Sequence, residues 1–256
     1  MKYLLLGRRS LRWVLWVPCL AFTHTAAARP GGQPLSQPPG WMAGGEARAF
    51  ASGTARIVRE FVWGQSLEPA QGVLRLRAVD NTWGQDLSTP DRLQEGVARV
   101  WVPGDKAEYY VKLTGLTPLG ERRPTLGGVL LNHPMFGDTN LGGPGLFPRL
   151  KAYVAVWGRA DVLKNKKPIA RGRQVLAWVG QGARDSQGKW LYEADPNQVT
   201  AHLIVFGSLG GGSRLPNTRD GFLHFEWPAA KVSVPGFAYD PATQPAPGKM
   251  ADMKQG

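Results

Sequence analysis

The segment that most constrains the fold is Lys151–Gln181. It holds two runs rich in β-branched and aromatic residues, Tyr153–Val162 and Ile169–Val179, on either side of the polar stretch Lys164–Pro168. Two such runs around a short turn-forming stretch predict a β-hairpin. In the first run both alternating sets of side chains are apolar, which is typical of a strand that is covered on both faces. We therefore expect this hairpin to lie in the middle of a sheet.

Shorter β-signals recur on both sides of the hairpin. In Val73–Val79, apolar residues alternate with Arg75 and Arg77, as in a half-exposed antiparallel strand. Many short strands separated by Gly and Pro, with no sustained helical period, indicate an all-β fold. We expect an antiparallel β-sandwich of about nine to eleven strands, with a β-barrel as the alternative.

The first 28 residues have the layout of a secretory signal peptide. A basic stretch that ends at Arg12 precedes the apolar run Trp13–Phe22, which is too short to span a bilayer, and the small residues Ala26–Ala28 follow. We therefore expect cleavage near Ala28 and a periplasmic or secreted protein with no transmembrane segment in the mature chain. Arg8 and Arg9 faintly resemble a twin-arginine signal, so both export routes stay open.

Cys19 is the only cysteine of the chain and lies inside the apolar run. Lipid anchoring at Cys19 is one alternative, although Pro18 stands where a small residue is usual. After cleavage near Ala28 the mature chain has no cysteine, and therefore neither a disulfide nor a thiolate metal site.

Composition divides the remaining chain into three parts. Residues 29–46 are rich in Pro and Gly and predict a flexible tether, whereas residues 47–234 carry the β-signals of one sandwich domain. Residues 235–256 are again rich in Pro, and we expect a disordered tail there.

The chain is basic, with a formal net charge of +12. Removal of residues 1–28 takes away four basic and no acidic residues, which leaves 12 − 4 = +8. An excess of this kind suits an anionic surface, a glycan or an acidic partner protein, and nucleic acid is not expected outside the cytoplasm. Two pairs at alternate strand positions, Arg75 with Arg77 and Arg171 with Arg173, are candidates for a positive ligand-binding stripe.

Tryptophan offers a second kind of contact. Trp157 and Trp178 lie on the hairpin and are expected to fill the core, whereas Trp41 in the tether and Trp83 in a turn are the candidates for exposure. Exposed indoles of this kind could stack on sugar rings.

Histidine is scarce, which makes its placement informative. His202 and His224 lie on two predicted strands joined by one loop, so their side chains could approach each other. His133 in a long loop and Glu226 could complete a site for copper or zinc. The alternative is that these histidines are packed structural residues.

The sequence contains no GxSxG or HExxH motif, and its carboxylates are scattered. The function expected is therefore that of an exported, non-catalytic binding or accessory protein with a basic β-sandwich surface, whose ligand is anionic or a glycan. Two alternatives remain, a periplasmic metal-binding protein and a hydrolase that acts on an acidic or glycan substrate.

Overall fold

The computed structural model describes residues 45–81, 90–117, 128–137, 148–207 and 214–243, all in the part of the chain after Pro38. The predicted signal peptide, Cys19, Trp41, Trp83 and nearly all of the tether lie outside these residues. The described elements, in order, are β1 (Gly45–Val58), β2 (Leu67–Asp80), β3 (Arg92–Val102), the 3-10 helix η1 (Pro103–Asp105), β4 (Ala107–Leu116), β5 (Val129–Met135), β6 (Leu150–Lys164), β7 (Lys167–Arg184), β8 (Trp190–Val205), β9 (Leu223–Trp227), β10 (Lys231–Val234) and β11 (Phe237–Tyr239).

All described strands belong to one antiparallel sheet, in the order β11-β10-β1-β2-β3-β4-β6-β7-β8-β9, with β5 paired to β6. The far end of β1 also pairs with β9, through Arg56 opposite Glu226 and Ile57 opposite Phe225. The antiparallel all-β class and the number of strands are therefore confirmed. Within the described residues, no helix is long and apolar enough to cross a membrane.

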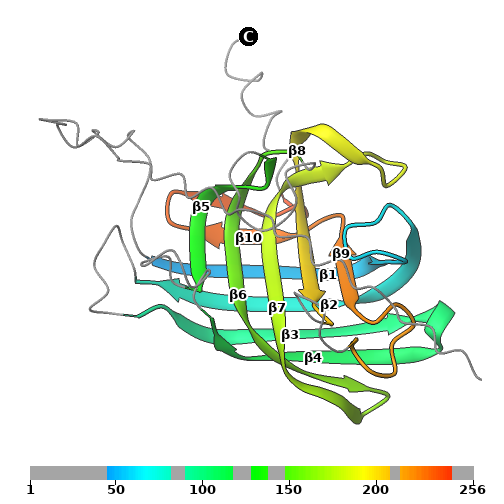
Figure 1. Ribbon diagram of the computed structural model, residues 1–256. Coiled ribbons are helices and arrows are strands. Elements are labelled where there is room, and N and C mark those ends of the chain that lie inside the picture. Colours follow the sequence, from blue (N-terminus) through cyan, green and yellow to red (C-terminus); the bar gives the residue numbers. More distant parts are fainter. Residues whose placement is uncertain (1–44, 82–89, 118–127, 138–147, 208–213, 244–256) are drawn as a thin grey trace, which may run out of the picture. The chain divides into compact units, whose positions relative to one another are not determined.

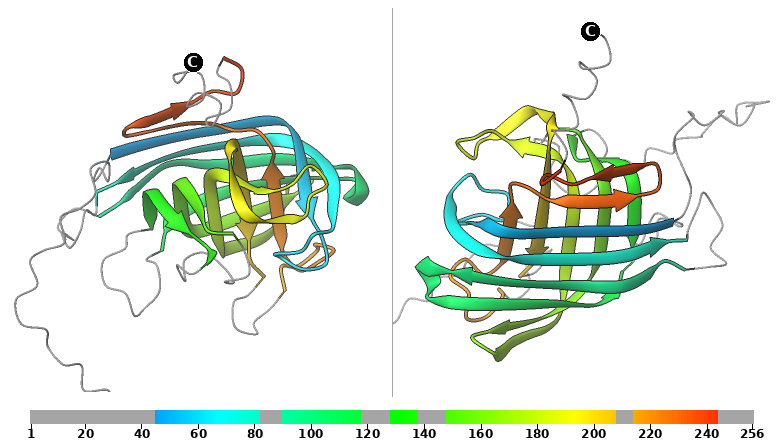
Figure 2. Two further views of the ribbon diagram at one scale, coloured as in Figure 1. Left: turned by 90° about the horizontal axis from the view of Figure 1, so that it is seen from above. Right: turned by 180° about the vertical axis from the view of Figure 1, so that it is seen from behind.

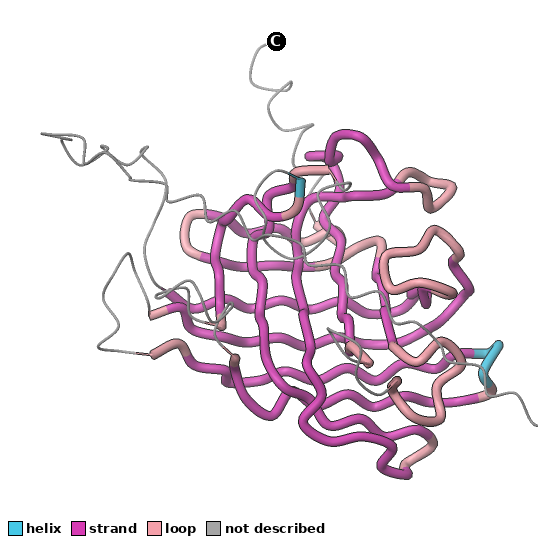
Figure 3. The backbone as a smooth tube through the Cα atoms, in the orientation of Figure 1, coloured by secondary structure: helices cyan, strands magenta, loops and turns pink. Residues whose placement is uncertain are grey.

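The sheet bends back over itself, so that β1–β4 form one layer and β5–β9 form a second layer across it (Figure 1). The strands of the two layers cross steeply, as the views from above and behind also show (Figure 2). Strands make up most of the described chain and loops join their ends (Figure 3). Sheets that cross in this way bury the side chains that point into the space between them.

Two hydrophobic cores cover the two faces of the β6–β7 hairpin. Val154 and Val156 belong to the first core, which lies between the layers, whereas Ala155 and Trp157 belong to a second core on the opposite face. The hairpin pairs with β4 and β5 on one side and with β8 on the other, so its expected central place is confirmed. Tyr153 joins the first core, because a bulge between Ala152 and Val154 shifts the alternation.

The turn of this hairpin is shorter than expected. Lys164 pairs with Lys167, so only Asn165 and Lys166 remain in the turn. Both residues have positive φ, 50° and 66°, as a type I′ turn requires. Such a turn matches the twist of the flanking strands, which is why the two long strands continue almost to its tip.

The domain extends past both expected boundaries. β1 begins at Gly45, in the last residues of the predicted tether, and β11 lies in the predicted disordered tail. Phe237 stacks on Tyr153 with ring centroids 4.1 Å apart, and Tyr239 is buried. These two aromatic side chains hold β11, the first part of the predicted tail, to the sheet.

Candidate functional site

The outer surface of the β1–β4 layer carries alternating charged and apolar side chains, and we call it the basic face. Arg75 and Arg77 point outward from β2, because Leu74, Leu76 and Ala78 between and beside them are buried. The outward set includes the bases Arg48, Arg75, Arg77, Arg99 and Lys112 and the acids Glu46, Glu95 and Glu108.

Most bases of the basic face are paired. Glu46 accepts hydrogen bonds from Arg77 and Arg48, and these lower the pKa of its carboxyl to about 2. Arg99 donates to Glu108 over 2.6 Å. Arg75 is different, since it has no ion pair or hydrogen-bond partner among the described side chains. Its strand neighbours are Phe50, which is 39% exposed, and Val97.

The second predicted basic pair lies on β7 and does not form a simple stripe. Gly172 stands between Arg171 and Arg173 with a φ of 59°, and the register with β6 shifts there. Arg173 donates to the carbonyl oxygen of Gly207 over 3.0 Å, so part of its hydrogen-bonding capacity is used inside the protein. A bulge of this kind breaks the strict alternation that the sequence pattern assumed.

A pocket of about 590 Å³ opens at the end of the basic face, and we call it the Trp101 pocket. It lies where β1 and β2 meet the turn that joins β7 to β8, and Trp101 at the end of β3 forms part of its wall. Its lining residues are Thr54, Ala55, Arg56, Leu67, Glu68, Pro69, Ala70, Gln71, Trp101, Pro103, Ser186 and Gln187.

Two side chains give the Trp101 pocket its chemical character. The Trp101 side chain is 45% exposed, although tryptophan is usually well buried. Arg56 is the cation of the pocket. It makes no direct ion pair among the described residues, but Glu226, its strand partner on β9, interacts with it electrostatically. Glu68 is the acid of the pocket, but its two oxygens accept from Arg59 and Arg219.

Behind this pocket, the two strand histidines meet in the second core. His202 Nδ1 lies 3.2 Å from His224 Nε2, and His224 Nδ1 lies 2.7 Å from the carbonyl oxygen of Val62. A carbonyl can only accept, so His224 carries its proton on Nδ1 and its Nε2 accepts from His202. His202 Nε2 then accepts from the hydroxyl of Thr200, at 3.2 Å. All four ring nitrogens are therefore engaged.

The environment keeps both rings neutral. Burial is the main cause that lowers the pKa of His202, and it lowers the pKa of His224 to about 3. The ring of His202 stacks on Trp178 with centroids 4.1 Å apart. Closely packed neutral imidazoles of this kind are structural elements of a core.

The predicted metal ligands do not assemble into one site. Glu226 Oε2 is 3.9 Å from His202 Nδ1, but the carboxylate is held by Arg184 at 2.7 Å. His133 lies on β5, which is separated from β8 by β6 and β7, or roughly 14 Å at the usual strand spacing. In the part of the chain that the structure describes, no group of three or more His, Cys, Asp or Glu is placed to hold a metal ion.

The ion pair of Arg184 with Glu226 fixes the wall of the Trp101 pocket. Arg184 also donates to the carbonyl oxygens of Gly188, at 2.7 Å, and of Gly64, at 2.8 Å. Its guanidinium lies 3.7 Å from the ring centroid of Trp190. The buried polar cluster therefore ties the β7–β8 turn and the β1–β2 connection to the second layer.

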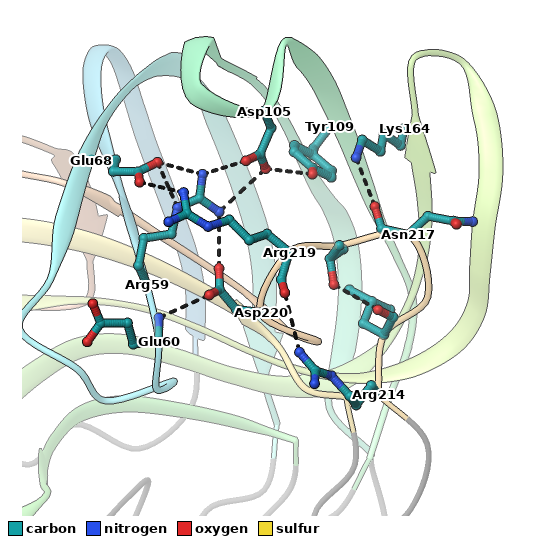
Figure 4. Close-up of polar contacts among 12 residues, drawn as sticks. Arg59, Glu60, Glu68, Asp105, Tyr109, Lys164, Arg214, Asn217, Arg219 and Asp220 are labelled. Carbon is teal, nitrogen blue, oxygen red and sulfur yellow. Dashed lines mark hydrogen bonds and ion pairs between the residues drawn. The ribbon is translucent and has the colours of Figure 1, made fainter.

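A second buried ion cluster surrounds Arg59 (Figure 4). It lies beside the Trp101 pocket, because Glu68 belongs to both. The Arg59 guanidinium contacts Glu68, Asp105 and Asp220 at 2.8, 2.7 and 3.1 Å. Tyr109 donates its hydroxyl to Asp105 over 2.8 Å. One cation thus holds together the start of β2, the helix η1 and the segment that precedes β9.

The carboxylates of this cluster bear on the hydrolase alternative. Asp105 and Asp220 converge on one guanidinium, and Asp220 also accepts from the backbone N–H of Glu60 over 3.1 Å. A glycosidase needs two carboxylates that face a substrate across a cleft. These two instead share a buried cation, so the cluster has the character of a structural support.

Sequence reasoning missed Arg56 and Trp101. Trp101 was one of several tryptophans without a mark of exposure, and Arg56 lies in an ordinary strand pattern. Comparison with protein families, with characterised proteins and with solved structures finds no match for this chain.

Proposed function

We propose that this protein is an exported, non-catalytic binding protein that holds an anionic polysaccharide on its basic face. The observation that carries the proposal is Arg75, an exposed and unpaired cation that lies between Phe50 and Val97 on a solvent-facing sheet. Cations beside apolar side chains suit a ligand that carries both charge and apolar ring faces.

The rest of the basic face supports this ligand class. Lys112 is exposed on β4 opposite Val97, so a second cation lies beside the row of Phe50, Arg75 and Val97. Arg99 and Tyr110 are strand partners in the next row. The net charge that remains after removal of residues 1–28, 12 − 4 = +8, adds a long-range attraction for anions.

The experiment measures the affinity of the purified protein for polygalacturonate by calorimetry, at low and at high NaCl. We expect binding that weakens with salt, because exposed charges are screened. The variant Arg75→Glu/Lys112→Glu should bind about tenfold more weakly at low salt. The control Lys166→Glu/Lys167→Glu makes the same change of charge at the hairpin turn and should bind nearly as the wild type does.

Three outcomes would contradict the proposal. Absence of binding at low salt is one. Equal losses in the two double variants are another, since the basic face would then have no special role. The third is equal binding to phosphatidylglycerol vesicles with the same variant dependence, which would indicate a membrane ligand.

A further inference from the structure

The Trp101 pocket has the size of a small-molecule site and a lining that suits one kind of ligand. Its volume of about 590 Å³ falls in the range usual for ligand pockets, which are mostly apolar with a few placed polar groups. We propose that it binds one acidic sugar residue, a hexuronate unit, of the polysaccharide. This inference rests on the function proposed above and adds a defined subsite to it.

The apolar wall is formed by Trp101 and its neighbours. Trp101 lies opposite Gln71 on β2, and Pro69 and Pro103 are also in the lining. A pyranose ring has a flat face of C–H groups, and burial of that face against an indole removes apolar surface from water. Exposure of 45% leaves the indole accessible to such a ring.

Arg56, the cation of the pocket, favours an acidic sugar over a neutral one. Arg56 lies in the lining and makes no direct ion pair among the described residues, although the carboxylate of its strand partner Glu226 interacts with it electrostatically. A planar guanidinium matches a carboxylate with two parallel hydrogen bonds. Glu68 is already held by Arg59 and Arg219, so its two oxygens are engaged. Arg56 is therefore the one guanidinium of the described pocket lining, and it makes no direct ion pair.

The remaining polar groups suit sugar hydroxyls. Thr54, Gln71, Ser186 and Gln187 supply hydroxyl and amide groups, and none of these side chains has a hydrogen-bond partner in the described part of the chain. Amides and hydroxyls both donate and accept, as sugar hydroxyls do. They can therefore orient the ring once Arg56 holds the carboxylate.

The wall that carries Ser186 and Gln187 is preorganised. Asp185 Oδ1 accepts from the backbone N–H of Gln187 and of Lys189, both at 2.9 Å, and the Gly188 carbonyl accepts from Arg184. Gly188 packs so closely that a Cβ there would lie 2.5 Å from Leu67 Cδ1. A wall that is already ordered loses little conformational entropy when the ligand binds.

The test compares tri-galacturonate with the neutral trisaccharide galactotriose, by calorimetry on the purified protein and four variants. Trp101→Ala should weaken tri-galacturonate binding at least about tenfold, and Trp101→Phe should lose less. Arg56→Gln should remove the preference for the acidic over the neutral trisaccharide, and Arg56→Lys should restore part of it.

The outcomes separate the subsite from the basic face. If Trp101→Ala and Arg56→Gln bind tri-galacturonate as the wild type does, the subsite is wrong, and binding of polygalacturonate that depends on Arg75 would still stand. Wild-type binding of galactotriose equal to that of tri-galacturonate would also overturn the acidic ligand. Thermal unfolding midpoints of the Trp101 and Arg56 variants that equal that of the wild type exclude unfolding as the cause of weaker binding.

Discussion

His202 Nδ1 donates a hydrogen bond to His224 Nε2 across 3.2 Å, and both side chains are buried in the core, away from water. The partners on the outer sides, Thr200 and the carbonyl of Val62, leave no ring nitrogen free. A contact expected from strand neighbours thus turns out to join β8, β9 and the β1–β2 connection. Because the pair is buried and neutral, we expect it to affect the stability of the protein against pH and its ability to bind metal ions.

The first prediction concerns stability against pH. Burial lowers the pKa of both histidines, to about 3 for His224. Below pH 6.5, the ordinary pKa of histidine, the unfolded chain therefore takes up protons on these two side chains and the folded protein does not. The free energy of unfolding should therefore fall as pH falls from 6.5, by up to about 1.4 kcal/mol per pH unit for each histidine.

The charged neighbours of the pair are Arg184 and Glu226, and Arg56 acts in turn on Glu226. Burial raises the pKa of Glu226, so its protonation favours the folded state at low pH and offsets part of the effect. Urea unfolding from about pH 7 to about pH 5 measures the slope. The variant His202→Gln/His224→Gln should lose less stability over that range, and an unchanged slope would refute the assignment.

The second prediction concerns metals. Because all ring nitrogens of His202 and His224 are engaged and Glu226 is held by Arg184, we expect no stoichiometric Cu²⁺ or Zn²⁺ binding that depends on these histidines. Metal titration of the wild type and of His202→Ala/His224→Ala measures this. Near-stoichiometric binding that the variant loses would restore the metal-binding alternative.

The third prediction concerns Arg59. Its removal would leave Glu68, Asp105 and Asp220 close together without their shared cation. Arg59→Met should therefore lower the free energy of unfolding by about 3–5 kcal/mol, the usual cost when one partner of a buried ion pair is removed. Arg48→Met is the matched control on an exposed pair and should cost about 0–1 kcal/mol. Equal losses of unfolding free energy for the two variants, measured by urea unfolding, would show that the Arg59 cluster stabilises the protein no more than an exposed ion pair does.

The fourth prediction concerns the hairpin turn. Lys166 holds a φ of 66°, which glycine adopts without strain. Lys166→Gly completes the preferred Asn-Gly turn and should stabilise the protein by about 0.5 kcal/mol. Lys167→Gly, one residue later in the strand, should destabilise it by about 0.5–1 kcal/mol. Thermal midpoints of the two variants that move in the same direction would contradict the turn assignment.

Features that depend only on neighbouring residues along the chain could be predicted from the sequence. The Lys151–Gln181 hairpin follows from two apolar alternations around a polar turn, and Trp157 and Trp178 are buried as expected. The approach of His202 to His224 follows from two strands joined by one loop. Local alternation failed at Tyr153 and between Arg171 and Arg173, because bulges change the register without a mark in composition.

The candidate site could not be predicted in the same way. Arg56, Trp101 and Gln187 come from three distant parts of the chain and meet only because β1 curls to pair with β9 and the β7–β8 turn packs on Leu67. The predicted approach of His133 to His202 is not observed, because β6 and β7 separate β5 from β8 in the sheet. Contacts between layers depend on the bend of the sheet, which no single stretch of sequence encodes.

The proposed ligand site is tested most directly by a titration of the isotopically labelled protein with tri-galacturonate, followed by amide and indole N–H resonances. We expect the largest shifts at the Trp101 indole and at the amides of Arg56, Gln71 and Gln187, with smaller shifts along the basic face around Arg75. Shifts spread evenly over exposed basic residues, or confined to other parts of the protein, would contradict it.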